Sequence, residues 1–271
     1  MRETMTVLGA LDIEHISATQ IGMYQRCPRQ WAYRYVLKVK SPPDAAILCG
    51  SGMHHAAEVG MLEKSVTGEN PKPDDAADAA RDYVANEFAA GEVVLSQKDT
   101  RGGIVDKAVR LTRKWAEDAA PLVEPVGVEQ SFDTEISGVK VIGRFDVVTD
   151  SSIIDWKSSS RKPARAQIAN SPQTEVYALV SGRAVNYIYV VDSVRNGPAV
   201  HEAPLTDDEV NTARAVATAT VEDVSAGMAS GVWPRNRNGW HCSPDRCGYY
   251  RRCMASKDDS TLREMAQVAN A

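Results

Sequence analysis

The residues of this chain most able to do chemistry are two acids and a lysine on neighbouring apolar runs. The segment GRFD ends in Asp146, and the segment DWK, nine positions further on, begins with Asp155 and ends with Lys157. The apolar runs at 139–148 and 153–157 flank a polar turn, which predicts a β-hairpin. Because side chains alternate along a strand, Asp155 and Lys157 face one side, and Asp146 can reach that side from the partner strand.

Two carboxylates and an ammonium group at one place predict a particular chemistry. Carboxylates at short range repel each other unless a cation lies between them. A hard divalent ion such as Mg²⁺ takes oxygen ligands and is often held by one or two carboxylates together with a substrate phosphate. The triad therefore predicts a metal-dependent site that cleaves phosphodiesters. The alternative is a solvated ion pair at a strand end, which is the commoner meaning of the pattern taken alone.

The composition is that of an ordinary soluble protein. Of 271 residues, 43% are hydrophobic and 25% are charged, which is usual for a globular chain. No apolar run approaches the roughly 18 residues of a membrane span, and the charged first 20 residues do not resemble a secretory signal. The net charge of −5 argues against coating nucleic acid by bulk charge. We therefore expect a cytoplasmic protein without membrane contact.

The cysteines form the second constellation. Their odd number argues against a disulfide framework, and three of them lie within twelve residues near the C-terminus. Thiolates suit zinc or an iron–sulfur cluster, and the absence of a tight C-x₂-C pair favours the cluster. Cys27, at a helix break, is the best candidate for the fourth ligand. His241 is the second, which would make a Cys₃His zinc site, and Cys49 the third, although a lone apolar-flanked cysteine is usually a buried hydrophobe. The five cysteines are Cys27, Cys49, Cys242, Cys247 and Cys253.

The order of expected elements indicates an α/β core with a mixed sheet. Capping boxes at Ser17 and Thr206 mark two helix starts, and His54 is expected near the start of a helix entered from a loop within 50–63. The other helices are expected at 17–26, 28–41, 74–90, 103–120, 164–180 and 206–228. The strands are expected at 126–136, 139–148, 152–158, 185–191 and 198–204.

Several motifs in the same order resemble those of the PD-(D/E)xK nuclease superfamily. Within it, the chain is similar to the RecB-like exonucleases that carry an iron–sulfur cluster. That group includes the CRISPR-associated adaptation nuclease, the AddB nuclease domain and stand-alone phage versions. The matching segments are SATQIGMYQRCPRQWAYRY at 17–35, GSGMHHAAE at 50–58, GRFD at 143–146, DWK at 155–157, QTEVY at 173–177 and the three C-terminal cysteines.

The resemblance, which spans residues 17–254, implies a single nuclease domain with a restriction-endonuclease-like core. In that core a central mixed β-sheet is flanked by helices, and an iron–sulfur cluster joins the N- and C-terminal segments. The implied divisions are N-terminal helices at 17–60, a helical insertion at 61–125, the nuclease core at 126–230, a cluster-binding segment at 231–254 and a tail at 255–271.

The resemblance also implies roles for individual residues. Lys157 would position or deprotonate the attacking water, and Gln173 and Tyr177 would orient Lys157 or contact the DNA backbone. The ligands of Mg²⁺ or Mn²⁺ would be His54, Asp146, Asp155 and the backbone carbonyl of Trp156. The ligands of a 4Fe–4S cluster would be Cys27, Cys242, Cys247 and Cys253.

The implied activity is a metal-dependent DNA exonuclease acting on single strands or DNA ends, in recombination, repair, or CRISPR-type or phage DNA processing. The alternative is a DNA-end-binding accessory subunit with a helicase, recombination or CRISPR-adaptation partner. The intact DxK triad favours the enzyme, and the sequence has no Walker motif of its own.

Nucleic-acid contact is expected from basic residues on the N-terminal helices, from those that follow the DWK strand, and from arginines interleaved with aromatics in the tail. The aromatics could equally shield a cluster from water. The N-terminal basic residues are Arg26, Arg29, Arg34, Lys38 and Lys40, and the second group is Arg161, Lys162 and Arg165. The tail aromatics are Trp233, Trp240, Tyr249 and Tyr250.

Overall fold

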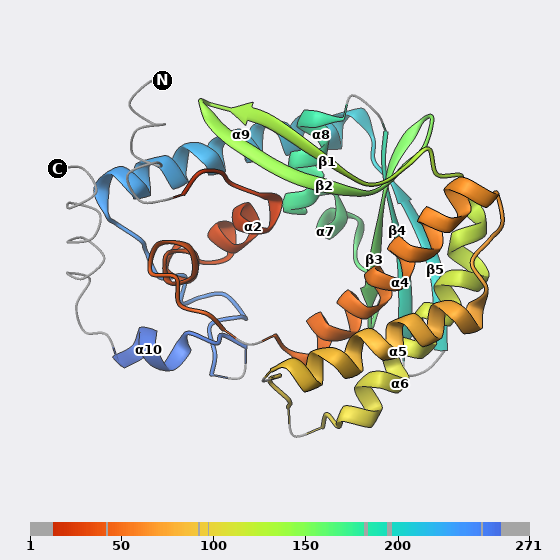
Figure 1. Cartoon of the computed structure of the whole chain (residues 1–271). Coiled ribbons are helices and arrows are strands. Elements are labelled where there is room, and N and C mark those ends of the chain that lie inside the picture. The colour runs from red at the N-terminus through yellow and green to blue at the C-terminus, as the bar shows by residue number, and fades with distance from the viewer. Residues whose placement is uncertain are drawn as a thin grey trace.

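The computed structural model describes residues 13–41, 43–91, 93–96, 98–181, 184–193, 197–244 and 246–255. Its centre is a five-stranded sheet in the order β1-β2-β3-β4-β5, shown in Figure 1. Strands β3 and β4 are parallel, and the other neighbouring pairs are antiparallel, so the predicted mixed sheet is confirmed. The strands are β1 (Gly127–Ile136), β2 (Val139–Val148), β3 (Ser152–Ser159), β4 (Ala184–Ser193) and β5 (Gly197–Pro204).

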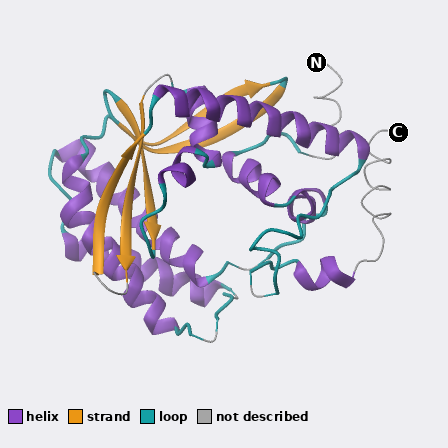
Figure 2. Ribbon diagram, turned by 180° about the vertical axis from the view of Figure 1, so that it is seen from behind, coloured by secondary structure: helices purple, strands orange, loops and turns teal. Residues whose placement is uncertain are grey.

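Helices cover both faces of this sheet, as the view from behind in Figure 2 also shows. On one face Met53 of α4 and Trp115 pack against Trp156 of β3. On the other face Ile168 and Tyr177 pack against β3 and β4. The helices are α2 (Ala18–Arg26), α3 (Pro28–Trp31), α4 (Ala45–Thr67), α5 (Pro73–Ala90), α6 (Arg101–Lys114), α7 (Arg165–Ala169), α8 (Pro172–Val180), α9 (Asp207–Ser230) and α10 (Tyr250–Ala255). Shorter π- and 3₁₀-helical turns are Ala32–Val36, Trp115–Ala119 and Ala120–Leu122.

The predicted β2–β3 hairpin forms, but its arms part early. Only two residue pairs, Val147 with Ile154 and Val148 with Ile153, connect the strands, whereas β1 and β2 pair along their whole length. Strand β2 therefore leaves the sheet together with β1, and this ribbon curves away from β3 in Figure 1. Beyond these two pairs the strands diverge, so Asp146 of β2 and Asp155 of β3 are the first residues that are not paired across them.

Three expectations about helices need correction. Helix α4 begins at Ala45, with the Asp44 carboxylate accepting the Ile47 N–H at 2.9 Å, so residues 50–63 are helical throughout and His54 lies in its third turn. Gly52 of this segment is a packing residue within the helix, since a Cβ there would come within 2.9 Å of Val84.

The second correction concerns residues 164–180, which form two helices rather than one. Pro172 occupies the first turn of α8, where its missing N–H costs nothing, and it would break a continuous helix. The third concerns the helix expected over 28–41. It ends with the π-helical turn at Val36, and Lys38 follows with a left-handed φ of 53°.

The two predicted helix caps differ in completeness. At Thr206 both halves of the capping box are present. At Ser17 the hydroxyl accepts the Gln20 N–H at 3.3 Å, but the Gln20 side chain donates to the His15 carbonyl instead of returning to the cap. None of the helices in the described part of the chain has the length and apolar character needed to cross a membrane.

Candidate active site and cysteine site

Asp146 is fixed at the point where β2 and β3 separate. Its Oδ2 accepts the backbone N–H of Trp156 at 2.9 Å, so a side chain completes the bond that a continued ladder would have made. The Trp156 indole faces the opposite side of β3 and packs edge-on against Trp115, with ring centroids 5.7 Å apart. One strand thus holds a core tryptophan on one side and presents the acid and lysine on the other.

Asp155 and Lys157 form an ion pair on that second side. The Asp155 carboxylate is fully buried, whereas the Lys157 side chain keeps 25% of its surface exposed. Burial raises the pKa of Asp155 to about 6, although the Lys157 charge opposes the shift. The Lys157 ammonium also lies 5.8 Å from the centroid of the Tyr187 ring. The pair therefore extends from the protein interior to an accessible surface.

His54 approaches the same place from helix α4. Its Nδ1 lies 3.3 Å from Asp146 Oδ2. Burial alone would lower the pKa of His54, but the contact with Asp146 raises it above the ordinary value. The same contact holds the pKa of Asp146 below its usual range, against the effect of burial. The neighbouring His55 packs on Tyr83 instead, with ring centroids 5.1 Å apart, so the two adjacent histidines have different partners.

Helix α8 places Gln173 and Tyr177 on one face, four residues apart. The Tyr177 hydroxyl lies 3.2 Å from Asp155 Oδ1 and 3.0 Å from the Arg144 carbonyl oxygen. The Gln173 amide donates to that hydroxyl at 3.4 Å. The contact is therefore with Asp155 rather than with Lys157, and Tyr177, at 2% exposure, is too buried to contact a DNA backbone.

His54, Asp146, Gln173 and Tyr177 border an open groove of about 340 Å³. Asp155 adjoins this groove through its contact with Tyr177. Two further carboxylates lie in its lining. Glu129 forms an ion pair with Arg144 and has a left-handed φ of 51°, and burial together with the nearby Asp146 raises its pKa. Glu58 lies one helical turn after His54, a four-residue spacing that could have identified it in the sequence. The lining comprises Ser51, His54, His55, Glu58, Tyr83, Glu129, Arg144, Asp146, Gln173 and Tyr177.

The predicted metal ligands are engaged with protein groups. Asp155 contacts Lys157 and Tyr177, while Asp146 contacts His54 and the Trp156 N–H. Within the described ranges, no three His, Cys, Asp or Glu side chains form a group that could hold a metal ion. The expected ligands therefore lie near one another but do not form a metal-binding group in this arrangement, and their assignment stays a prediction. A divalent ion would have to replace Lys157 at Asp155 or His54 at Asp146.

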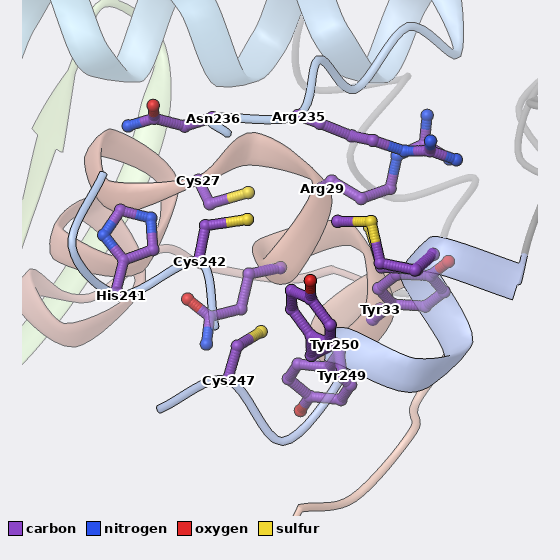
Figure 3. A pocket seen from close by; sticks show the side chains of 13 residues that line it. Cys27, Arg29, Tyr33, Arg235, Asn236, His241, Cys242, Cys247, Tyr249 and Tyr250 are labelled. Carbon is purple, nitrogen blue, oxygen red and sulfur yellow. The ribbon is translucent and has the colours of Figure 1, made fainter. Parts of the chain in front are cut away.

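A second site gathers the cysteines. Cys27, in extended conformation between α2 and α3, shares one pocket with the three C-terminal cysteines. Figure 3 shows Cys27, Cys242 and Cys247 directed into this pocket. Burial raises the pKa of the Cys247 and Cys253 thiols, and nearby arginines partly oppose it at Cys253. Cys49 lies elsewhere, buried among α4, α5 and α6.

Hydrogen bonds already join the two chain segments at this pocket. Arg29 Nε donates to the Trp233 carbonyl at 2.9 Å, and the Asn236 amide donates to the Arg26 carbonyl at 2.9 Å. The Tyr249 hydroxyl donates to the Val39 carbonyl at 2.9 Å. Arg29 is only 2% exposed, so the expectation that it contacts nucleic acid is wrong: it secures the tail.

Comparison with known proteins gives the family. A family model of the PD-(D/E)XK nuclease superfamily matches residues 15–254. The chain belongs to this superfamily, whose nucleases typically use divalent ions such as Mg²⁺ or Mn²⁺. Among solved structures, a protein from Eubacterium rectale that carries the provisional name of exonuclease superimposes with a TM-score of 0.59. It is 11% identical, with 90% of each chain covered, so the likeness is one of fold. No curated protein matches.

Proposed function

We propose that this chain is a metal-dependent DNA exonuclease of the RecB-like iron–sulfur group, hydrolysing phosphodiester bonds in single strands or at DNA ends. The observation that carries the proposal is the cluster of Asp146, Asp155 and Lys157 with His54, beside an open groove that His54 and Asp146 line. Family membership supports a nuclease and, with it, DNA as the substrate. The intact triad favours an enzyme over an accessory subunit.

The residues of the groove have distinct proposed tasks. His54, Asp146, Asp155 and the Trp156 carbonyl would hold Mg²⁺ or Mn²⁺, which polarises a phosphate and lowers the pKa of water. Lys157, released from Asp155 by that ion, would position the attacking water or stabilise charge that develops on the phosphate.

Other residues would keep those groups in place. Tyr177 keeps Asp155 in position, and Gln173 keeps the Tyr177 hydroxyl in position. The Trp156 N–H does the same for Asp146. The hydrogen bonds that carry these tasks measure 3.2, 3.4 and 2.9 Å and are buried or partly buried, so these side chains are positioned before substrate binds.

The four-cysteine pocket would hold the 4Fe–4S cluster through Cys27, Cys242, Cys247 and Cys253. Its all-sulfur donor set supports this choice, because thiolates are the usual ligands of such clusters. The cluster would join α2 and α3 to the tail. A cytoplasmic role in recombination, repair, or CRISPR-type or phage DNA processing, with a helicase or adaptation partner, completes the proposal.

The test uses end-labelled single-stranded and duplex DNA with Mg²⁺, Mn²⁺ or no divalent ion, beside the variant Lys157→Ala. We expect ion-dependent release of short products from one labelled end by the natural protein and none by the variant. Products cut from internal positions would show that the activity is that of an endonuclease and not of an exonuclease. Equal degradation by both proteins, or no degradation by either, would overturn the proposal.

A further inference from the structure

One tryptophan of this chain is not packed like the others. Trp31, Trp115, Trp156 and Trp233 are at most 2% exposed, whereas Trp240 is 77% exposed. An indole offers a large flat apolar area, and proteins usually bury it in a core or use it at an interface. The structure thus separates the tail aromatics: Trp233 and Tyr249 are internal, Tyr250 is half-buried, and Trp240 presents most of its indole to a partner.

Trp240 is held in a fixed turn. The Cys242 N–H donates to the Gly239 carbonyl at 2.9 Å, and the Ser243 N–H donates to the His241 carbonyl at 3.0 Å. A Cβ on Gly239 would fall 2.1 Å from the His241 ring, so this glycine lets the imidazole fold close to the turn. His241 in turn lies edge-on to Trp240, with ring centroids 6.1 Å apart. The indole is therefore displayed on an ordered backbone.

Positive charge surrounds the exposed indole. The Arg246 guanidinium lies 5.6 Å from the Trp240 ring centroid. Arg26, exposed at the end of α2, is joined to the tail through its carbonyl, which accepts the Asn236 amide at 2.9 Å. Residues 231–255 carry five arginines against one acid in a chain whose net charge is −5. Four of these arginines are exposed: Arg237, Arg246, Arg251 and Arg252.

We propose that Trp240, Arg246 and Arg26 form a binding surface for single-stranded DNA, separate from the carboxylate groove. An unpaired base stacks on the open face of the indole, and the arginines contact the adjacent phosphates. A duplex does not fit this arrangement, because its bases are already stacked on each other. The choice of DNA rests on the proposed function, while the surface itself rests on the exposed indole and its arginines.

The first experiment measures binding of a fluorescent oligothymidylate by anisotropy in buffer without divalent ions, so that cleavage does not interfere. We expect Trp240→Ala to weaken binding about tenfold, because stacking of a base on an aromatic is typically worth that much. Trp240→Phe keeps an aromatic face and should bind within about threefold of the natural protein. Affinity that is unchanged in Trp240→Ala would overturn the proposal.

The charge of the surface has a matched control. Arg246→Gln should weaken binding and reduce the slope of log affinity against log salt by about 0.7. Arg101→Gln removes the same charge from another cation–π pair, in which the guanidinium lies 5.2 Å from the Phe88 ring, and should leave binding unchanged. An equal effect of both variants would mean that bulk charge, and not this surface, attracts DNA.

Further measurements distinguish a loss of DNA binding from a loss of folding. Iron content and melting temperature show whether a variant has disturbed the adjacent cysteine pocket. If Trp240→Ala does not fold, iodide quenching of tryptophan fluorescence replaces it. The part of the fluorescence that iodide quenches in the natural protein, and that is missing in Trp240→Phe, belongs to Trp240. Oligothymidylate should protect that part from iodide. Stronger binding to vesicles of phosphatidylcholine and phosphatidylserine than to the oligonucleotide would identify a membrane surface instead and overturn the proposal.

This surface and the proposed nuclease can fail separately. If the natural protein cleaves DNA and its Trp240→Ala variant binds DNA normally, the proposed binding surface is wrong and the proposed nuclease activity stands. If binding depends on Trp240 but no DNA is cleaved, the proposed nuclease activity is wrong and the proposed binding surface stands.

Discussion

The carboxylate groove and the cysteine pocket are built in opposite ways. In the groove, Asp146, Asp155 and Tyr177 lie on regular strands and a helix, and protein groups contact each of them. In the pocket, Cys27 lies at a helix break and Cys242 and Cys247 in irregular chain. The residues at the groove are thus held in place by regular strands and a helix. The pocket is held together by a few hydrogen bonds and by the cluster that we propose for its thiols.

This difference separates the expected consequences of losing each set of ligands. Removing a groove carboxylate should abolish chemistry and leave folding nearly intact, because the sheet holds the site. Removing a pocket cysteine should weaken the fold, because binding of the proposed cluster there would also contribute folding free energy. The predictions below test that separation, beginning with the largest effect.

Asp146→Asn should lower the cleavage rate by at least about 100-fold, because the amide keeps the bond to the Trp156 N–H but loses the charge that a metal ion needs. Its melting temperature should change little. Asp133→Asn is the matched control, since Asp133 forms an exposed pair with Lys140 at 2.8 Å on the neighbouring strand. Product release is quantified for both variants. Equal cleavage by the two would contradict the assignment of Asp146 as a metal ligand.

Cys27→Ser should remove the broad absorbance near 400 nm expected of a cluster and lower the free energy of unfolding by at least about 2 kcal/mol. Cys49→Ser is the control, because Cys49 is buried away from the pocket, with its thiol 3.5 Å from the Ile104 carbonyl. Iron analysis and chemical denaturation measure both effects. A Cys27→Ser protein that retains its full iron content would show that the pocket is not the cluster site.

Tyr177→Phe should lower kcat about tenfold with little change in KM, because the hydroxyl positions Asp155 and does not bind substrate. Tyr24→Phe deletes another buried hydroxyl, which donates to the Asp223 carbonyl at 2.9 Å, and should affect stability without affecting kcat. Steady-state kinetics distinguishes the two. A change in KM alone for Tyr177→Phe would indicate a substrate contact instead.

The smallest effect concerns a contact that joins the two regions. The Gln25 amide, two residues before Cys27, donates at 2.7 Å to Glu175 of α8. Burial raises the pKa of Glu175 from 4.5 to about 7. The folded protein therefore binds more protons than the unfolded chain between those values, so this group's contribution to stability is complete below about pH 4.5 and is lost as pH rises towards 7.

Glu175→Gln should therefore reduce the loss of stability between pH 5 and pH 8 by about 1 kcal/mol. Some dependence should remain, because the pKa of Asp155 is raised in the same direction. Glu63→Gln, at an exposed position on α4, is the control and should leave the slope unchanged. Melting temperatures across this pH range measure the effect, and identical slopes for both variants would contradict it.

Local features explain what the sequence predicted correctly. The strand bounds followed from alternating apolar residues, and the start of α9 from Thr206 and its capping box. The features that were missed depend on contacts between distant segments. The start of α4 was misplaced because Gly52 packs against Val84, which no local pattern reveals. The contact of Tyr177 with Asp155 required the early separation of β2 and β3, which depends on how the β1–β2 ribbon packs.

The candidate sites divide along the same line. The types and order of Asp146, Asp155 and Lys157 were visible, since the hairpin that carries them is local. Glu58 was not singled out, although its four-residue spacing from His54 would place both on one face of a helix. The exposure of Trp240 likewise follows from the packing of the tail on α2 and α3 and not from the tail's own composition.

We propose that Asp146, Asp155 and Lys157, beside the groove, cut DNA. The most direct test is the single-turnover cleavage rate of end-labelled single-stranded DNA at saturating protein with Mn²⁺, for the natural chain and Lys157→Ala with equal iron content. We expect a fall of at least about 100-fold in the variant, with DNA binding unchanged. Equal rates for the two proteins would contradict it.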